Sequence, residues 1–174
     1  WQRGLGLAFL RAFVDFTWEH GGDPATEMSA VCKGSGDAGT DTPTCVCSLT
    51  KSTGLSLVES CLHLLERDSL EAPPGLFGSA TTFFSYSWTG TRLDDMLGAI
   101  ADAAPGLPFS ATVGGPCVWV DMFAASQNLL AGTFYDEAHL KGSTGYAARK
   151  EDTDRIFDDA LGAVRAVLFY CSPL

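Results

Sequence analysis

One six-residue stretch decides the fold, and it reads Thr81-Thr82-Phe83-Phe84-Ser85-Tyr86. Its residues are β-branched or aromatic and apolar enough on both faces for a buried β-strand. A turn at Thr89-Gly90-Thr91 follows, where Thr91 can cap a helix. The next apolar residues recur at helical spacing and predict an amphipathic helix over 92–104, which Pro105-Gly106 ends. A strand followed by a helix is therefore the unit from which this half of the chain is built.

The same alternation continues toward the end of the chain. Buried strands are predicted over 117–120 and 166–171, and an amphipathic helix over 151–164 precedes the second of them. Short strands that are apolar on both faces and alternate with helices indicate a parallel sheet joined by right-handed crossovers. The sequence thus predicts an α/β domain of three layers with a short parallel sheet.

The first part of the chain has a different pattern. Helices are predicted over 4–19 and 54–67, and the residues between them are rich in Gly, Asp, Thr and Ser. Pro73-Pro74-Gly75 then stops any helix. We expect an N-terminal helical extension over 1–75 and a partial α/β domain over 76–174.

Composition excludes several classes of partner. The chain of 174 residues has a net charge of −10, and its 11 Lys and Arg form no basic stripe, so nucleic acid is not expected. The apolar runs are too short to cross a bilayer, so no membrane is expected. Of the six cysteines, Cys117 and Cys171 fall in strand-like runs and are expected to be buried thiols. We therefore expect a reducing, cytoplasmic setting.

The ends of the three strands predict where a ligand would bind. Parallel α/β sheets bind ligands beyond the carboxyl ends of their strands. The residues expected there are Ser85, Tyr86, Ser87 and Trp88 after the first strand, Asp121 and Phe123 after the second, and Ser172 after the third. Hydroxyls, a carboxylate and an indole suit a ribose or nucleotide. Purely structural roles for these residues stay open. The serines could cap a turn, Trp88 could cover the sheet edge, and Asp121 could be a turn carboxylate.

Other motifs have structural explanations. The glycines at 34, 36 and 39 match a dinucleotide fingerprint, but Thr40-Asp41-Thr42-Pro43 cannot form the helix that it requires. Cys45 and Cys47, taken with Cys32 and His63, do not have the spacing of a zinc finger, so no metal is expected. The acidic residues at 151–159 fit a solvated helix start.

Three strings resemble the TIR family in order and spacing. They are Phe83-Phe84-Ser85-Tyr86-Ser87-Trp88, Cys117-Val118-Trp119-Val120-Asp121-Met122-Phe123, and Val167-Leu168-Phe169-Tyr170-Cys171-Ser172-Pro173. They are similar to the family's opening strand, to its next strand, which ends in Asp, and to its V-L-V-L-S-P strand. The likeness is nearest to a TIR-like group of algae, oomycetes and fungi with the motifs F-V-S-H-A-W and F-V-W-x-D-x-F-x-x-N-Q-H. In this chain Ser126-Gln127 stand where that group has N-Q.

The resemblance implies a flavodoxin-like fold and one of two functions. TIR domains assemble signalling complexes or cleave NAD, and the catalytic glutamate of the cleaving members lies after the S-P strand in a W-C-x-x-E setting. No residue up to Leu174 matches that glutamate, and Glu137 is not assigned to the role. The leading expectation is an intracellular signalling module that associates with itself or with other TIR-like domains, with no tightly bound cofactor. The alternatives are an NAD-cleaving enzyme completed by a carboxylate from elsewhere, for which NAD would be the substrate, and a nucleotide-binding domain without catalysis.

Overall fold

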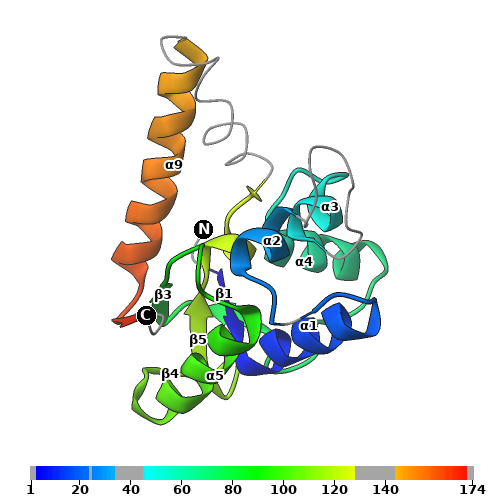
Figure 1. Ribbon diagram of the computed structural model, residues 1–174, viewed down its shortest axis with the longest axis vertical. Coiled ribbons are helices and arrows are strands. Elements are labelled where there is room, and N and C mark those ends of the chain that lie inside the picture. The colour runs from blue at the N-terminus through cyan, green and yellow to red at the C-terminus, as the bar shows by residue number, and fades with distance from the viewer. Residues whose placement is uncertain (1–2, 24, 34–44, 128–143, 172–174) are drawn as a thin grey trace.

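A computed structural model describes residues 3–23, 25–33, 45–127 and 144–171, and over 144–153 it describes the backbone alone (Figure 1). Strands and helices alternate along these residues. The strands are β1 (Arg3–Gly6), β2 (Phe77–Ser79), β3 (Thr82–Ser85), β4 (Phe109–Ser110), β5 (Gly115–Trp119) and β6 (Ala166–Phe169). The helices are α1 (Leu7–Glu19), α2 (Met28–Lys33), α3 (Val46–Thr50), α4 (Leu57–Arg67), α5 (Leu93–Ala103), α6 (Asp121–Ala124) and α9 (Thr144–Ala163), with a 3-10 turn at Ala104–Gly106.

The strands form one open, mixed sheet with the order β2-β1-β5-β3-β6, and β4 pairs with β5 outside this path. β3 is parallel to β5, with Phe83 opposite Trp119, and parallel to β6, with Phe84 opposite Leu168. The three strands predicted from sequence are thus neighbours, and the first of them in the chain lies in the middle. This arrangement is compatible with a flavodoxin-like α/β fold. The predicted parallel pairing is confirmed for β5, β3 and β6, whereas β1, β2 and β4, which the sequence did not predict, pair antiparallel and make the sheet mixed.

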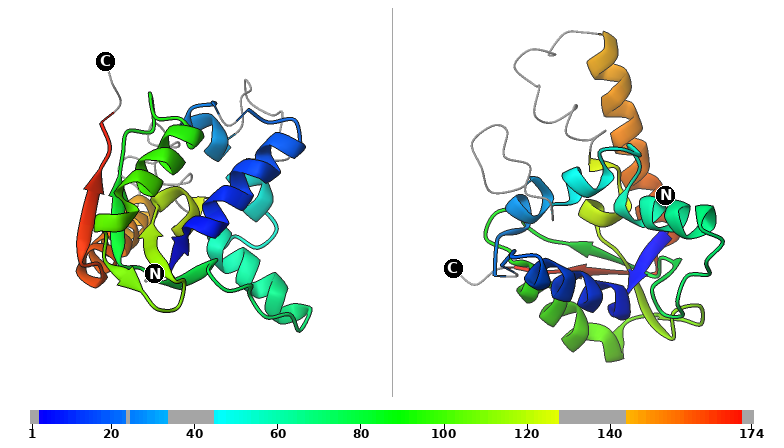
Figure 2. Two further views of the ribbon diagram at one scale, coloured as in Figure 1. Left: turned by 90° about the horizontal axis from the view of Figure 1, so that it is seen from below. Right: turned by 90° about the vertical axis from the view of Figure 1, so that its right-hand side faces the viewer.

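Helices cover both faces of the sheet. In the right-hand view of Figure 2, α1 and α5 lie below the sheet and α9 lies above it. Because side chains alternate along a strand, Phe83 and Trp119 pack against Ile156 of α9, whereas Phe84 packs in the larger core with Leu10 and Ile100. The strands are apolar on both faces because helices cover both faces of the sheet.

The first residues differ from expectation, because the predicted helix over 4–19 begins only at Leu7. Arg3–Gly6 form β1, which pairs with β5 on one side and β2 on the other. A Cβ at Gly4 would lie 3.0 Å from Cys117 Sγ, and one at Gly6 would overlap the carbonyl oxygen of Gly75. Glycine permits this close approach. The N-terminal segment thus supplies both a strand and α1 to the common sheet and core, instead of a purely helical extension, and the boundary at residue 75 stays a prediction.

The other predicted helices begin or end a few residues from the sequence estimate. The helix expected over 54–67 is α4, which begins after Ser56; the Ser56 side chain accepts a hydrogen bond from the Glu59 amide, and the Glu59 carboxylate accepts from the Ser56 amide. This reciprocal cap satisfies two amides that have no partner within the helix. The helix expected over 92–104 is α5, and the one expected over 151–164 is the second half of α9.

The two cysteines expected to be buried have different environments. Cys117 is fully buried in β5, and this burial raises the pKa of its thiol to about 11. The burial of Cys171 was wrongly predicted: β6 ends at Phe169, and Cys171 lies beyond it with an exposed side chain. The six cysteines form no disulfide with one another.

Candidate functional site

The carboxylate of Asp121 connects the ends of β3 and β5. Its Oδ1 accepts a hydrogen bond from the Tyr86 hydroxyl at 2.7 Å and one from the Met122 amide at 2.7 Å. Its Oδ2 accepts a hydrogen bond from the indole nitrogen of Trp88 at 2.9 Å. Since β3 and β5 are parallel neighbours, their carboxyl ends lie at the same edge of the sheet, where sequence analysis placed the candidate site. We call Tyr86, Trp88 and Asp121 the strand-end cluster.

Burial dominates the electrostatics of the strand-end cluster. Burial raises the pKa of Asp121 above its ordinary value, while the hydrogen bonds from Tyr86, Trp88 and Met122 act in the opposite direction. Burial also raises the pKa of Tyr86 well above its ordinary value, and the negative charge of Asp121 adds to this effect. Tyr86 therefore keeps its proton at neutral pH, and its hydroxyl donates a hydrogen bond to Asp121.

The N-terminal segment covers the strand-end cluster. The Met28 amide donates to the Thr91 carbonyl at 2.8 Å, and the Ser29 amide donates to the Trp88 carbonyl at 3.1 Å. These bonds fix the start of α2 to the turn that follows β3, and Figure 1 shows α2 beside the ends of the strands. The turn after β3, where the sequence predicted a ligand, is thus bonded to the chain's own backbone.

The side chain of Gln127 connects α2 with the strand-end cluster. Its side chain is almost fully buried, and its Nε2 donates to the carbonyl oxygen of Asp121 at 2.8 Å and to that of Ala125 at 3.3 Å. Its Oε1 accepts a hydrogen bond from the thiol of Cys32 in α2 at 3.4 Å. Sequence reasoning placed Gln127 near the site but did not select it, and nothing in the local sequence around Cys32 indicates its contact with Gln127.

The remaining predicted site residues have other contacts or lie outside the described residues. Phe123 is fully buried and its ring packs against Phe9 and Phe13 of α1, so its side chain belongs to the core. Ser85 accepts a hydrogen bond at its carbonyl from the Tyr170 amide, and Ser87 is exposed, with its hydroxyl 3.5 Å from that of Thr89. Ser172 lies outside the described residues, as do Glu137 and the glycine-rich stretch at 34–39.

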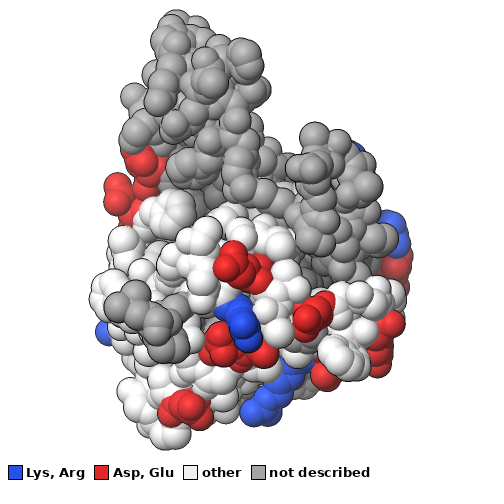
Figure 3. Space-filling view, viewed as in Figure 1, with Lys and Arg blue, Asp and Glu red and all other residues white. Residues whose placement is uncertain are grey.

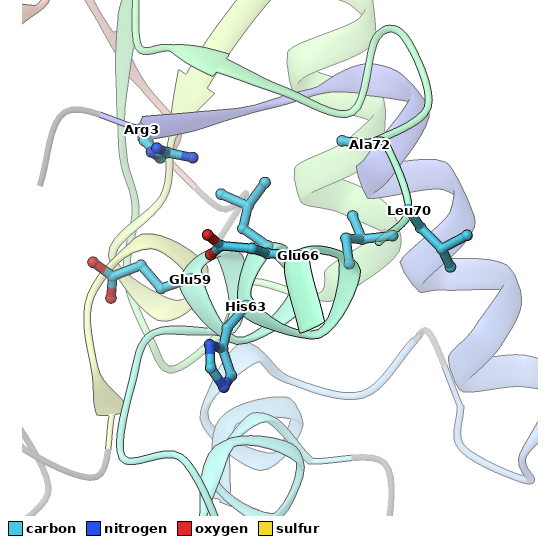
Figure 4. A pocket seen from close by; sticks show the side chains of 8 residues that line it. Arg3, Glu59, His63, Glu66, Leu70 and Ala72 are labelled. Carbon is cyan, nitrogen blue, oxygen red and sulfur yellow. The ribbon is translucent and has the colours of Figure 1, made fainter. Parts of the chain in front are cut away.

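Two hollows lie elsewhere on the chain, and sequence reasoning predicted neither of them. One, of about 590 Å³, lies between α4 and β1 and presents Arg3 opposite Glu59 and Glu66, with His63 nearby (Figure 4). Glu59 is already engaged in the cap of α4. The other, of about 520 Å³, is an apolar groove between α1 and α4 that includes Phe13, Phe16 and Leu64. Neither hollow contains a residue of the strand-end cluster.

The described surface carries scattered charges on the face that Figure 3 draws. On the face drawn in Figure 3, acidic side chains are scattered among uncharged ones and the basic side chains form no patch. Among the described residues, no group of three or more His, Cys, Asp or Glu side chains is arranged to hold a metal ion. Within the same part of the chain, no helix is long and apolar enough to cross a membrane.

The fold and the strand-end cluster define an α/β protein with an open sheet, three of whose strands are parallel and whose strand ends are tied together by a carboxylate. No protein-family model matches this chain, and neither does any curated protein or solved structure.

Proposed function

We propose that this chain is a TIR-like signalling module that associates with a second copy of itself through the edge of the sheet at β6. One observation carries the proposal: within the described residues β6 is the last strand of the sheet order, and its exposed side chains are large and apolar. Val167 is 41% exposed and Phe169 is 73% exposed. An edge strand of this composition is a template for pairing with another chain.

The register of β6 places these side chains on one face. Val167 lies opposite Phe83, whose ring packs under α9, so Val167 and Phe169 continue the α9 face of the sheet outward. Leu168 and Tyr170 point to the other face and contact the larger core. A strand added beside β6 would thus bury Val167 and Phe169 without disturbing the core.

The two edges of the sheet differ in their protection. β2 at the far edge has three residues and follows Pro73-Pro74, and short strands and prolines are common defences against pairing. β6 has the sequence Ala-Val-Leu-Phe, without proline, lysine or any other charged residue. Two copies that each carry a charge of −10 repel one another, and an uncharged strand is where they can approach most closely.

The uncharged edge of β6 favours pairing with a second copy of this chain. The outward backbone of β6 supplies the same donors and acceptors in both copies, so two β6 strands can pair antiparallel about a two-fold axis. The TIR resemblance supports this proposal, because the three strings that carry it form the adjacent strands β5, β3 and β6.

The alternative of NAD cleavage has no comparable support among the described residues. A catalytic carboxylate must be able to reach the substrate. Asp121 is the carboxylate that the fold brings to Trp88, and both of its oxygens already accept hydrogen bonds from its own chain. This arrangement favours a role for Asp121 in holding β3 and β5 together. Nicotinamide release from NAD by the purified chain would overturn this view.

Sedimentation equilibrium over a wide range of protein concentration tests the association. We expect a monomer–dimer equilibrium that shifts toward the dimer as salt rises, because salt screens the repulsion between the two acidic copies. Phe169→Lys should raise the dissociation constant at least tenfold. Trp18→Lys is the matched control, because Trp18 is a similarly exposed aromatic residue (68%) on α1.

Three results would contradict the proposal. One is a strict monomer at the highest concentration of the wild-type chain. Another is a dimer that Phe169→Lys leaves intact. The third is a dimer that Trp18→Lys abolishes, since this would place the interface on α1.

A further inference from the structure

We propose that Cys32 and Cys47 form an oxidisable pair whose disulfide fastens α2 to α3 and changes the hydrogen bonding beneath the strand-end cluster. Cys32 lies in the last turn of α2 and Cys47 in the first turn of α3. Their Sγ atoms are 3.9 Å apart, although the residues are 15 positions apart in the sequence. Because a disulfide has an S–S length of about 2 Å, the two sulfurs need to approach by only about 2 Å.

The neighbouring cysteine is engaged elsewhere. Cys45 lies at the start of α3, where its Sγ accepts a hydrogen bond from the Ser48 amide and its thiol donates to the Ser48 hydroxyl. Cys117 is buried in β5, and burial raises the pKa of its thiol, which makes it a poor nucleophile at neutral pH. The 3.9 Å distance between the Sγ atoms of Cys32 and Cys47 therefore selects this pair, while Cys45 is bonded to Ser48.

The difference in exposure between Cys32 and Cys47 sets the order in which the two thiols react. Cys32 is only 1% exposed, whereas Cys47 is half-buried and is reached first by a hydroperoxide. The Cys47 thiolate attacks the peroxide, the O–O bond breaks, and a sulfenic acid and hydroxide form. The hydroxide takes up the proton that the Cys47 thiol released and leaves as water. The sulfur of Cys32 then attacks the sulfur of Cys47, the S–O bond breaks, and a second water leaves with the proton of Cys32. Two thiols and one hydrogen peroxide thus give one disulfide and two waters.

The disulfide alters a hydrogen-bonded chain that ends at Asp121. In the reduced form Cys32 donates to Gln127 Oε1, and Gln127 donates to the backbone carbonyl of Asp121. Oxidation removes the thiol proton, so Gln127 loses its donor and the end of α2 is held by a covalent bond in its place. The oxidation state of this pair is therefore coupled to the packing of α2 over the strand-end cluster.

The test is disulfide mapping on the wild-type chain, so it requires no variant to fold. The protein is exposed to stoichiometric hydrogen peroxide, remaining thiols are alkylated, and unreduced peptides are identified by mass spectrometry. We expect a peptide pair joined through Cys32 and Cys47, a mass lower by two hydrogen atoms, and alkylated Cys45. Cys45→Ser is the matched control and should give the same linkage.

The result that would overturn the proposal is equally specific. Both Cys32 and Cys47 would remain alkylated under conditions that oxidise the exposed Cys171, or Cys32 would be joined to a cysteine other than Cys47. Reduction with dithiothreitol must restore the original mass, and a mass that does not return also contradicts a simple disulfide.

Discussion

The Tyr86 hydroxyl donates to Oδ1 of Asp121 at 2.7 Å and joins two parallel strands across 35 positions of sequence. Tyr86 follows β3 directly, and Asp121 begins the single turn of α6 after β5. With Trp88 on the second carboxylate oxygen, this contact leaves each oxygen of Asp121 with at least one donor from its own chain. The contact therefore holds the carboxyl ends of β3 and β5 together.

Asp121→Asn should lower the free energy of unfolding by about 2 kcal/mol, the size of a hydrogen bond to a charged group. The amide that replaces one carboxylate oxygen is a donor, so it leaves either Tyr86 or Trp88 facing another donor. Urea unfolding of both proteins measures the difference. Asp102→Asn, on the exposed surface of α5, is the control and should be within about 0.5 kcal/mol of wild type. Equal effects for the two variants would mean that the strand-end cluster contributes nothing to stability.

The pH dependence of stability should include a contribution from Asp121. Its folded pKa is raised above the ordinary value of 3.8, mainly by burial, so the folded state holds this proton more tightly than the unfolded chain. The contribution to stability is therefore fully present below pH 3.8 and is lost as pH rises through the folded pKa. Unfolding of wild type and Asp121→Asn at a series of pH values isolates this contribution. The advantage of wild type over the variant should shrink as pH rises through this range, and an advantage that grows would contradict the sign.

Gly6→Ala should destabilise the protein by more than about 2 kcal/mol. A Cβ at this position overlaps the Gly75 carbonyl oxygen, so the backbone that supports β1 must move. Gly98→Ala is the matched control: Gly98 lies in α5 and a Cβ there meets no atom within 4 Å. Alanine favours a helix over glycine, so the control should stabilise by about 0.5–1 kcal/mol. Thermal unfolding of both variants should give melting temperatures that move in opposite directions.

Two adjacent threonines in or next to β3 should respond oppositely to replacement by valine. Thr82 is fully buried, and its hydroxyl has no hydrogen-bond partner among the described residues, so Thr82→Val should be neutral or stabilising by about 1 kcal/mol. Thr81 donates to the carbonyl of Pro108 at 2.9 Å and accepts from the Cys117 amide at 3.1 Å. Thr81→Val should therefore destabilise by about 1–3 kcal/mol. Chemical unfolding compares the two, and a loss of stability in Thr82→Val would indicate an unrecognised partner for its hydroxyl.

The parallel core of the sheet could be predicted from sequence because its signals are local. Phe83, Phe84, Val118 and Trp119 lie in short apolar runs, and turn or helix signals bound each run. β1 could not be predicted in the same way. Two of its four residues are glycines, which have low strand propensity, and its pairing depends on the close approach of Gly4 to Cys117. Only the folded arrangement shows that glycine is required there.

The candidate site was predictable to the extent that it follows from strand ends. Tyr86, Trp88 and Asp121 lie together because parallel neighbours end at one edge. The burial of Phe123 was not predictable, because it depends on how one helical turn docks against α1. The contact between Cys32 and Gln127 joins positions 95 apart and depends on the docking of α2, which no local pattern specifies.

The pairing of Leu5 with Val118 has a consequence for how the chain is made. β1 is synthesised before its partner β5, because Leu5 precedes Val118 by 113 positions in the sequence. Until β5 has been synthesised, the apolar face of α1 has no sheet to cover, and the nascent chain must hold this surface exposed. Such long-range pairing delays folding. We therefore expect β1 to dock only after β5 has been synthesised, although β1 leaves the ribosome earlier than β5.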